Sequence, residues 1–522
     1  MEVGIGIGFK TLTVLVGLKG PPTLPIIGNI HQLPKKDLHK AYQQWGEKYG
    51  PIFSLQLGQE TVIVLADGYA VKAVMDKRSG NTSDRPKLYM QDIWEGSRII
   101  MRGYDDLWKI ERRLYHIFLN QNVAAKYVPY QSLETKKMCL DLLDHPEAFV
   151  DHIGRATSSL STSMTYGFRI PTLGNPIAET MFETAHGFFA LVVNSQLFDW
   201  YPRLRIVAKI LPKWLNPLAA KGTRIYHKER AHFRQLFLDA KARGKSGTAL
   251  PCFALDIAQA QETWKDVDLL TDHAASYIAG ISFEAGADTS KNTLVGFIKA
   301  MVLFPEAQKL AQKEIDDVVG SDTMPGIEHS DQLPYIRGTV KESLRWMPTA
   351  ITGAVPHAAR TEDHVNGYRI PAGATISLAV WSCNNDPKLF HDPRVFNPAR
   401  HNVSLSIGQA AVAPDVKDRD MWTFGAGRRI CPGLQVAERT LFLSIARILW
   451  AFDITPERDA DGVALEIDPD AVTQSIGCCP LPFRCKITPR DEKRAQILRD
   501  EWARAQEVLT KDGNYKEYIL KK

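Results

Sequence analysis

The chain has 522 residues, of which 44% are hydrophobic and 24% are charged, and its formal net charge is +5. This is ordinary globular composition, and so small a net charge argues against a nucleic-acid partner, which would call for a concentrated basic stripe. The seven cysteines are odd in number, scattered and without paired spacing, which argues against a secreted disulfide framework or a zinc finger and favours a reducing compartment.

The first predicted element is a short apolar segment at residues 1–19. The stretch VGIGIGFKTLTVLVGL (3–18) contains Lys10 and is shorter than the ~20 apolar residues that a spanning helix needs. It is therefore either a weak or truncated membrane anchor, or a frayed terminus or buried strand. The prolines of GPPTLPIIGN (20–29) predict a stiff, extended spacer, because proline fixes φ and lacks a backbone donor.

The remainder, residues 20–522, shows no repeat or flexible linker, so we interpret it as a single domain that is mainly α with a minor β component. Strands are predicted within 52–66 and 374–380 from their apolar and alternating patterns. Helices are predicted over 271–304, which is mostly apolar, over 305–320, and over the charged C-terminal stretch 491–522, with DGN at 512–514 as a stop signal.

A single cysteine, Cys431, lies in the loop WTFGAGRRICPGLQVAERT (422–440). The loop is not a dinucleotide-binding motif, because the third required glycine is replaced by Ile430. An ordinary buried thiol and a thiolate presented to a metal remain as alternatives. Pro432 and the apolar periodicity that follows predict a helix N-terminus here, which would lower the pKa of the thiol from about 8.5.

Two further features of this loop point to a flat, anionic ligand. Gly427 and Gly433 lack side chains, so a planar group could approach the backbone closely. Arg428 and Arg429 carry charges suited to carboxylates.

The segment FGAGRRICPG resembles the haem-binding signature F-x-x-G-x-R-x-C-x-G of the cytochrome P-450 haem-thiolate monooxygenases. Every fixed position matches: Phe424, Gly427, Arg429, Cys431 and Gly433. The resemblance implies the cytochrome P-450 fold, with haem b (iron protoporphyrin IX) sandwiched between a long central helix and the cysteine loop. It also implies that Cys431 is the metal ligand, the axial thiolate of the iron.

Other segments extend this resemblance. ESLR (342–345) and FNPAR (396–400) resemble the family's structural network of a glutamate and two arginines, here Glu342, Arg345 and Arg400. AGADTS (285–290) resembles the segment in which the central helix is locally opened and an acid and a threonine manage protons near bound oxygen. The catalytic residues implied are Asp288 and Thr289.

Contacts to the haem propionates are implied by two more segments. WKIER (108–112) places Trp108 and Arg112 at the family's W-x-x-x-R, and PHAAR (356–360) adds His357. Arginine suits a carboxylate because its planar fork donates two hydrogen bonds. Matching the family's substrate-contacting regions gives the largely apolar stretches 88–101, 278–289, 351–355 and 475–477.

The function implied is insertion of one oxygen atom from O2 into an apolar small molecule, with electrons from NADPH–cytochrome P-450 reductase. The details resemble microsomal fungal enzymes of secondary metabolism, which implies a cytosolic catalytic domain at the endoplasmic reticulum membrane. Two alternatives are a haem-thiolate isomerase or dehydratase, which needs neither O2 nor reductase, and a non-catalytic haem-binding protein. An intact Asp288 and Thr289 argue against the isomerase.

Overall fold

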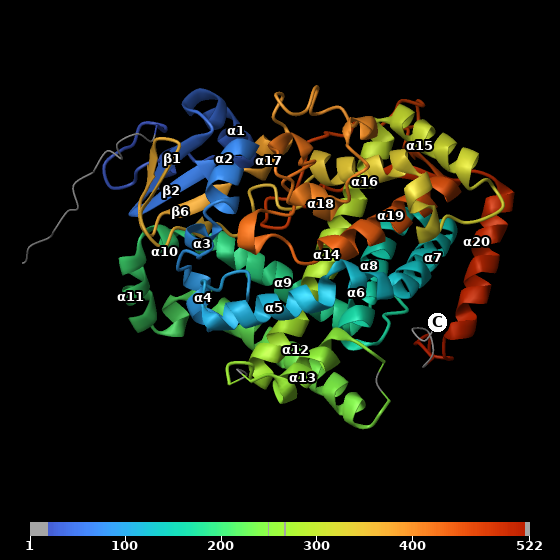
Figure 1. The fold of residues 1–522 in the computed structure, drawn as a ribbon, viewed down its shortest axis with the longest axis horizontal. Helices are drawn as coiled ribbons and strands as arrows, with labels where there is room; N and C mark the ends of the chain where they lie inside the picture. The colour runs from blue at the N-terminus through green and yellow to red at the C-terminus, as the bar shows by residue number, and fades with distance from the viewer. Residues whose placement is uncertain (1–18, 249, 266–267, 517–522) are drawn as a thin grey trace, which may run out of the picture.

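The computed structural model describes residues 19–248, 250–265 and 268–516, and helices dominate it (Figure 1). The longest helix, α14 (Asp272–Leu303), runs through the middle of the molecule. The other long helices are α1 (Leu38–Tyr49), α5 (Asp106–Leu119), α7 (Val128–Asp144), α8 (Phe149–Tyr166), α9 (Pro176–Asn194), α12 (Pro217–Lys245), α13 (Phe253–Thr263), α15 (Pro305–Val318), α16 (Pro334–Trp346), α19 (Leu434–Ala451) and α20 (Glu492–Ala505).

Short helices connect these. They are α2 (Gly68–Val71), α3 (Ser79–Thr82), α4 (Tyr89–Ile93), α6 (Gln121–Lys126), α10 (Gln196–Trp200), α11 (Pro202–Ile210), α17 (Val380–Asn384) and α18 (Ile407–Ala411). A π-helical turn, η2 (Lys72–Asp76), follows α2, and a 3-10 turn, η4 (Lys213–Leu215), precedes α12.

The main sheet lies to one side of α14 (Figure 1) and has the strand order β1-β2-β6-β3. The strands are β1 (Ile52–Leu57), β2 (Glu60–Leu65), β6 (Thr375–Leu378) and β3 (His357–Ala358). β1 and β2 form an antiparallel hairpin, β6 runs parallel to β2 with Val64 opposite Ser377, and β3 is antiparallel to β6. Two-stranded ribbons pair β4 (Asp363–Val365) with β5 (Tyr368–Ile370) and β7 (Phe452–Pro456) with β8 (Cys485–Pro489).

The core forms around α14, which packs against α8, α12 and α19. Side chains on several faces of α14 are buried, for example Ala279, Phe283 and Phe297. This is expected, because a helix that is apolar on all faces is stable only in the interior. α19 continues this core through Leu443 and Trp450. The cysteine loop is therefore attached to a helix whose far end is fixed in the interior.

The predictions at 52–66, 374–380, 271–304 and 305–320 are confirmed to within a few residues. The first region forms the β1–β2 hairpin, the second contains β6, and the last two are α14 and α15. The resemblance also implied a local opening of the central helix at 285–290, and this is wrong, because these residues are helical throughout. Thr289 Oγ1 donates to the carbonyl of Ala285 at 2.7 Å, so the hydroxyl is satisfied within the helix.

The spacer predicted at 20–29 is not extended. Leu24 and Gly28 form a bridge around a tight turn, and Gly28 also bridges to Leu57 of β1. Gly28 has φ +61°, and a Cβ there would lie 2.0 Å from the carbonyl oxygen of Gln56. The glycine therefore permits a left-handed, close approach that folds this segment onto the sheet.

The C-terminal helix is shorter than the predicted 491–522. α20 ends at Ala505, and after a 3-10 turn Leu509 bridges to Tyr515. Tyr515 is buried, with its hydroxyl 2.7 Å from Ser163 Oγ and its ring 4.7 Å from that of Tyr130, and these contacts hold the chain out of the helix.

The predicted N-terminal apolar segment lies outside the described residues, apart from Lys19. In the part of the chain that is described, no helix has both the length and the apolar character to span a bilayer.

Candidate active site

The cysteine loop folds back against η2. The Cys431 N–H donates to the carbonyl of Phe424 at 2.9 Å, and the Gly427 N–H donates to Asp76 Oδ1 at 2.7 Å. Gly427 has φ +61°, and a Cβ there would lie 2.0 Å from the carbonyl oxygen of Met75. This glycine is therefore required by the protein's own backbone packing.

The Cys431 thiol does not have the lowered pKa that its position predicts. Burial raises its pKa, and the opposing effects of the Gly433 N–H and of Arg112 do not outweigh it. The helix begins at Leu434 and not at Pro432, so the thiol lies further from the first turn than the sequence indicates. A coordinated metal cation would deprotonate the thiol outright, so this chemistry agrees with a metal ligand.

Gly433 differs from Gly427, because little in the chain excludes a side chain there. Its φ is −88°, and within 4 Å a Cβ would meet only Cys431 Sγ, at 3.9 Å. A planar group lying over the sulfur would use this space, which agrees with the flat ligand predicted from the sequence.

Arginines from distant segments meet beside this loop. Arg112 of α5 donates to the carbonyl of Ile430 at 2.8 Å. Arg429 donates to the carbonyls of Ser83 at 2.6 Å and Arg102 at 2.8 Å. The guanidinium of Arg429 also lies 4.7 Å from the ring centre of Trp108, which is buried.

A further arginine in this cluster, Arg85, belongs to none of the motifs that the sequence analysis identified. It donates to the carbonyls of Val355 at 2.5 Å and Pro356 at 2.9 Å, and its buried Nε has no partner. Burial and the charge of Arg429 hold its pKa well below the usual range. The half-buried guanidinium thus keeps donor capacity at its buried Nε, which is unfavourable unless a ligand anion satisfies it.

His357 lies in the same cluster. Burial and the charge of Arg85 hold its pKa well below the usual range, so it is neutral at pH 7. Its Nδ1 lies 2.8 Å from the carbonyl of Thr82, which can only accept, so Nδ1 carries the proton. A carboxylate placed beside Nε2 would raise the pKa of His357 and recruit a second proton to that atom.

The residues present therefore fit haem. Arg85, Arg112, Arg429 and His357 supply donors for two carboxylates, while burial lowers the pKa of each arginine. Three acids act on Arg429, and each already has a partner. Asp84 accepts from the N–H of Tyr104 at 2.9 Å, whereas Asp105 and Glu111 lie 3.7 and 3.3 Å from the guanidinium of Arg102. Propionates would provide the missing negative charge next to a planar ring over Cys431.

The predicted glutamate–arginine network is confirmed. Glu342 accepts two bonds of 2.7 Å from Arg345, and Arg400 Nε lies 3.2 Å from Glu342 Oε1. Sequence reasoning missed His401, whose Nε2 lies 2.7 Å from Glu342 Oε2. Burial alone would raise the pKa of Glu342, but Arg345 and His401 hold it at about 2.

This network is linked to the cysteine loop through Asn384. Arg345 donates to the Asn384 carbonyl at 2.7 Å, and Asn384 Oδ1 accepts from the N–H of Trp422 at 2.8 Å. Asn384 Nδ2 also donates to Thr423 Oγ1 at 3.1 Å. The ion network is thus a support beneath the loop.

The two predicted catalytic residues lie on α14, which packs against α19. Asp288 is buried, with Oδ2 3.3 Å from Asn292 Nδ2 and Oδ1 3.4 Å from His186 Nε2. Thr289 is exposed. Among the described residues, neither Asp288 nor Thr289 forms a hydrogen bond or an ion pair with Cys431. The structure thus brings together the predicted residues of the cysteine loop, α5 and β3, and it places this pair on α14, which packs against α19.

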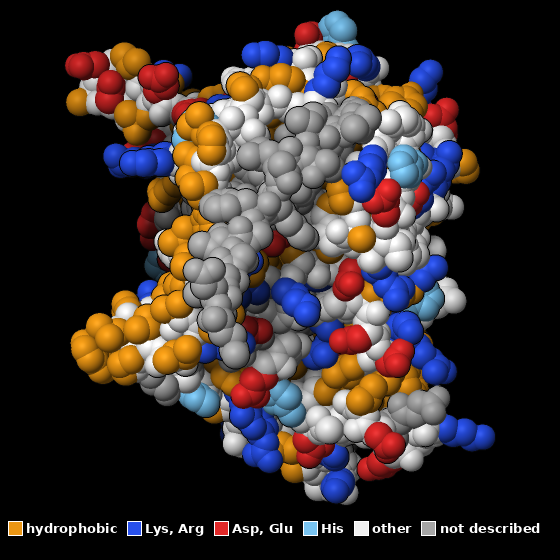
Figure 2. All heavy atoms as spheres, turned by 90° about the vertical axis from the view of Figure 1, so that its left-hand side faces the viewer, with side chains coloured by type: hydrophobic (Ala, Val, Ile, Leu, Met, Phe, Trp, Pro, Cys, Tyr) orange, Lys and Arg blue, Asp and Glu red, His pale blue; other side chains and the backbone are white. Residues whose placement is uncertain are grey.

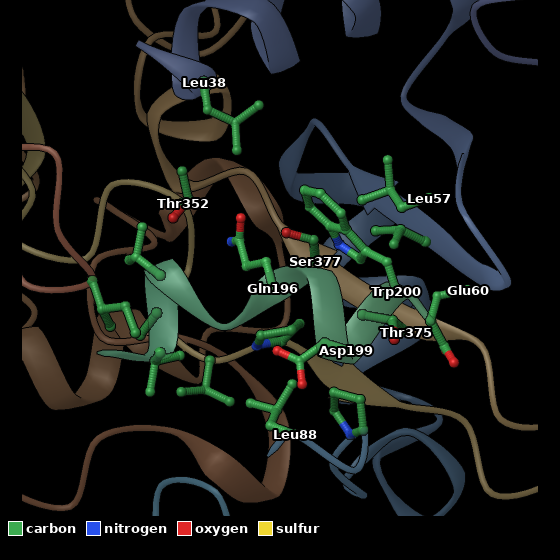
Figure 3. A pocket seen from close by; sticks show the side chains of 18 of the residues that line it. Leu38, Leu57, Glu60, Leu88, Gln196, Asp199, Trp200, Thr352, Thr375 and Ser377 are labelled. Carbon is green, nitrogen blue, oxygen red and sulfur yellow. The ribbon is translucent and has the colours of Figure 1, made fainter. Parts of the chain in front are cut away.

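A cavity of about 740 Å³ lies between the main sheet, α10 and the segments 351–359 and 472–478. Three of the four predicted substrate stretches contribute to its lining, through Leu88, residues of 351–355, and Ser475 and Ile476; the stretch 278–289 does not. In Figure 3 polar side chains such as Gln196, Thr352 and Ser377 lie among apolar ones. Arg85 also lines this cavity, which connects it to the arginine cluster.

Comparisons with known proteins give the family of the chain. The cytochrome P-450 family model matches residues 18–476. The chain is 42% identical over 503 residues to cytochrome P-450 monooxygenase virE of Hypocrea virens (95% of this chain, 90% of the relative). It is 40% identical over 504 residues to cytochrome P-450 monooxygenase fogE of Aspergillus ruber (95% and 91%).

A solved structure of a zebra fish cytochrome P-450 with abiraterone shares the fold. It matches with a TM-score of 0.67 and 21% sequence identity, over 87% of this chain and all of that one. The fold and the family match together define the cytochrome P-450 class of protein. The chain belongs to the cytochrome P-450 family and is a monooxygenase, and its family uses a haem cofactor, a redox partner, O2 and an organic substrate. The relatives' names favour this function over the isomerase and the non-catalytic binding protein.

Proposed function

We propose that the protein inserts one oxygen atom from O2 into an apolar small molecule of secondary metabolism, using haem b and electrons from NADPH–cytochrome P-450 reductase. The observation that carries this proposal is the placement of Cys431 in a loop held by Arg112, next to a cluster of half-buried arginines in which the buried Nε of Arg85 has no partner. Haem, when bound, supplies the oxygen-activating chemistry.

In this proposal the chain holds the haem from two directions. Cys431 provides the iron ligand, and Phe424, Gly427 and Gly433 shape the loop around it. Trp108, Arg112, Arg429 and His357 bind the propionates, and the structure adds Arg85 to this group. Charged hydrogen bonds to carboxylates are stronger than neutral ones, so this group fixes the orientation of the ring.

We assign proton delivery to Asp288 and Thr289. The Asp288 carboxylate is buried, but its neighbour His186 has a side chain that is 59% exposed. These two side chains form a path by which a proton can pass from solvent to α14. Thr289 Oγ1 holds the end of this path, since its hydroxyl can exchange the Ala285 carbonyl for a nearby oxygen acceptor.

Thiolate ligation is tested by the optical spectrum of the reduced carbon monoxide complex. The wild-type protein should show the strongly red-shifted band of a thiolate-ligated haem, and Cys431→Ala should lose it completely. Cys478→Ala is the matched control, because Cys478 is a buried free thiol outside the cysteine loop, and its Sγ lies 3.1 Å from the Ser475 carbonyl. Equal loss in both variants, or a histidine-type band in the wild type, would contradict the assignment.

The oxygenase function is tested by NADPH consumption with the reductase. Substrate should stimulate it, and metabolites of the native pathway can be screened by the spectral shift that they cause on binding. Thr289→Ala should fold and bind haem but release peroxide instead of product. If this variant keeps full coupling of NADPH to product, Thr289 has no role in proton delivery; product formation without NADPH would favour the isomerase.

We also propose that the protein lies on the endoplasmic reticulum membrane with its catalytic domain in the cytosol. Apolar side chains of α11 and η4 are exposed, with Ile210 and Trp214 each 79% exposed. Figure 2 looks onto the side that carries α11, where apolar side chains gather in protruding clusters. Exposed apolar patches of this kind are typical of membrane or protein contact sites.

The segment 20–29 lies on the same side of the molecule. The Tyr201 hydroxyl, next to α11, donates to the carbonyl of Ile26 at 3.2 Å, and Ile26 is itself exposed. Pro202 and Arg205 of α11 line the cavity. A lipid surface over α11 would therefore cover both apolar regions and lie beside the cavity.

Fractionation tests this placement. The full-length chain should pellet with microsomes, whereas the chain that starts at Gly20 should bind less tightly, and Ile210→Ser with Trp214→Ser should release it further. If full-length and shortened chains are equally soluble at low and high salt, the N-terminal segment is not an anchor. Undiminished binding of the double variant would show that α11 is not the contact.

A further inference from the structure

The turn formed by residues 94–98, between α4 and α5, is bound through its side chains to α12 and α14. Three hydrogen bonds join it to these helices: Trp94 Nε1 to Glu229 Oε1 (2.9 Å), Tyr226 Oη to Glu95 Oε2 (2.7 Å), and Ser97 Oγ with His273 Nε2 (2.9 Å). Most side chains of the turn are thus engaged by elements more than a hundred residues away in the sequence.

The fourth attachment is a buried ion triad. Arg98 lies between Glu229 of α12 and Glu284 of α14, with side-chain exposures of 1%, 0% and 6%. Arg98 Nε lies 3.2 Å from Glu229 Oε1, and Nη1 and Nη2 lie 2.9 and 2.8 Å from the two oxygens of Glu284. This use of three nitrogens on two carboxylates needs the planar fork of arginine, which lysine lacks.

The backbone of the turn is in an unfavourable conformation. Glu95 has φ +52° and Gly96 has φ +66°. The left-handed region is unfavourable for a glutamate, so the turn keeps this shape only while its surroundings impose it. Local backbone hydrogen bonds, from the Gly96 N–H to the Gln91 carbonyl at 3.0 Å and from the Ser97 N–H to the Trp94 carbonyl at 2.9 Å, contribute to this shape. The triad and the three side-chain hydrogen bonds fix the turn in that shape against α12 and α14.

The same turn lies next to the cavity wall. Trp94 packs in one apolar cluster with Val192 and Val355, both of which line the cavity. The guanidinium of Arg98 lies 3.9 Å from the ring centre of Phe188, a member of that cluster. Movement of the turn would therefore change the shape of the space available to a ligand.

We propose that Arg98 is a positioning residue that determines which ligands the active site accepts, by locking the 94–98 turn onto α12 and α14. Arg98 does not touch the reacting atoms. It joins three elements that are separate in the sequence, and it keeps the apolar wall of the cavity in one shape. The ligand-selection part of this inference rests on the proposed haem function, whereas the locking part does not.

The lock is tested by hydrogen–deuterium exchange. Glu229→Gln removes one charge with little change of shape, and Arg98→Lys keeps the charge but loses the fork. Both should raise exchange in peptides covering 88–101. The matched control is Glu134→Gln, because Glu134 is the buried centre of a second triad, with Arg155 and Arg169.

Glu134→Gln should raise exchange around α7 and α8 but leave 88–101 unchanged. Unaltered protection of 88–101 in both Glu229→Gln and Arg98→Lys would overturn the lock. An equal increase in the control would show that the effect is general loosening, and this would overturn it as well.

Ligand selection is tested on the haem-loaded protein by optical titration with imidazole and 4-phenylimidazole. Imidazole needs only the iron, whereas the phenyl group also needs the cavity wall. Glu229→Gln should weaken 4-phenylimidazole binding about 10-fold and imidazole binding less than about 2-fold, and Glu134→Gln should change neither. Equal weakening of both ligands, or no change in either, would overturn the proposal.

The two hypotheses fail in different ways. A wild-type protein that shows no optical shift with either azole would contradict the haem function, and with it the claim about ligand selection. The exchange experiment would still decide whether Arg98 locks the turn.

Discussion

The cysteine loop and the 94–98 turn are both irregular segments held by arginines, but these arginines have different partners. Beside the loop, Arg112 and Arg429 donate to backbone carbonyls, which carry no charge. At the turn, Arg98 donates to two carboxylates. The first kind of arginine keeps its charge available for an anionic ligand, whereas the charge of Arg98 is neutralised within the protein. The groups that an arginine contacts therefore indicate whether it belongs to a binding site or stabilises the fold.

The largest loss of stability is expected at the 94–98 turn. Arg98→Met should cost about 3–5 kcal/mol of unfolding free energy, because it leaves two buried carboxylates without a cation. Urea denaturation of the haem-free protein measures this. A loss below about 1 kcal/mol would show that Glu229 and Glu284 do not depend on Arg98.

Removing a charge from the ion network beneath the cysteine loop should cost a similar amount of unfolding free energy, and this cost should depend on pH. Glu342→Gln should cost about 3–5 kcal/mol at pH 7 and yield haem-poor protein. The folded-state pKa of Glu342 is lowered from 4.5 to about 2, so its stabilising contribution is present above about pH 4.5 and is lost as the pH falls toward 2. The difference between wild type and variant should therefore shrink over that range, and a constant difference would contradict it.

Two glycines of the cysteine loop should differ in their effect on stability. Gly427→Ala should destabilise the haem-free protein by about 1–3 kcal/mol, because φ is +61° and the new Cβ would meet the Met75 carbonyl. Gly433→Ala should leave that stability within about 0.5 kcal/mol, yet weaken haem binding. The pair separates a glycine needed by the chain from one needed by the ligand. Equal destabilisation would remove that distinction.

The smallest expected effect on stability is at Arg85. Because its Nε is buried without a partner, Arg85→Met should change the unfolding free energy of the haem-free protein by less than about 1 kcal/mol. Haem affinity should nevertheless fall, as measured by transfer of haem to apomyoglobin. A loss as large as that of Arg98→Met would show that Arg85 is structural.

Much of the cysteine loop and of the ion network beneath it could be predicted from the sequence, because their residues lie in short motifs. Cys431, Arg429 and Gly427 lie within a few residues of one another, and Glu342 with Arg345 occupies one helical turn. The helices at 271–304 and 305–320 could also be predicted, because the apolar residues that indicate them lie within each segment.

The contacts of the 94–98 turn could not be predicted, because they join elements that are far apart in the sequence. Nothing near Arg98 indicates that Glu229 and Glu284 face it. Arg85 was missed for the same reason. The pKa of Cys431 was predicted in the wrong direction because burial, which the sequence does not reveal, outweighs the helix terminus.

The position of α11 beside the cavity has a consequence for enzyme kinetics. Pro202 and Arg205 line the cavity while Ile206 and Ile210 of the same helix are exposed. With lipid over α11, a substrate would enter from the bilayer, and the concentration that governs turnover would be its mole fraction in lipid. Adding lipid vesicles at a fixed total amount of substrate would then dilute the substrate within the membrane and lower the rate. The apparent KM, expressed per volume of water, would rise in proportion to the lipid added.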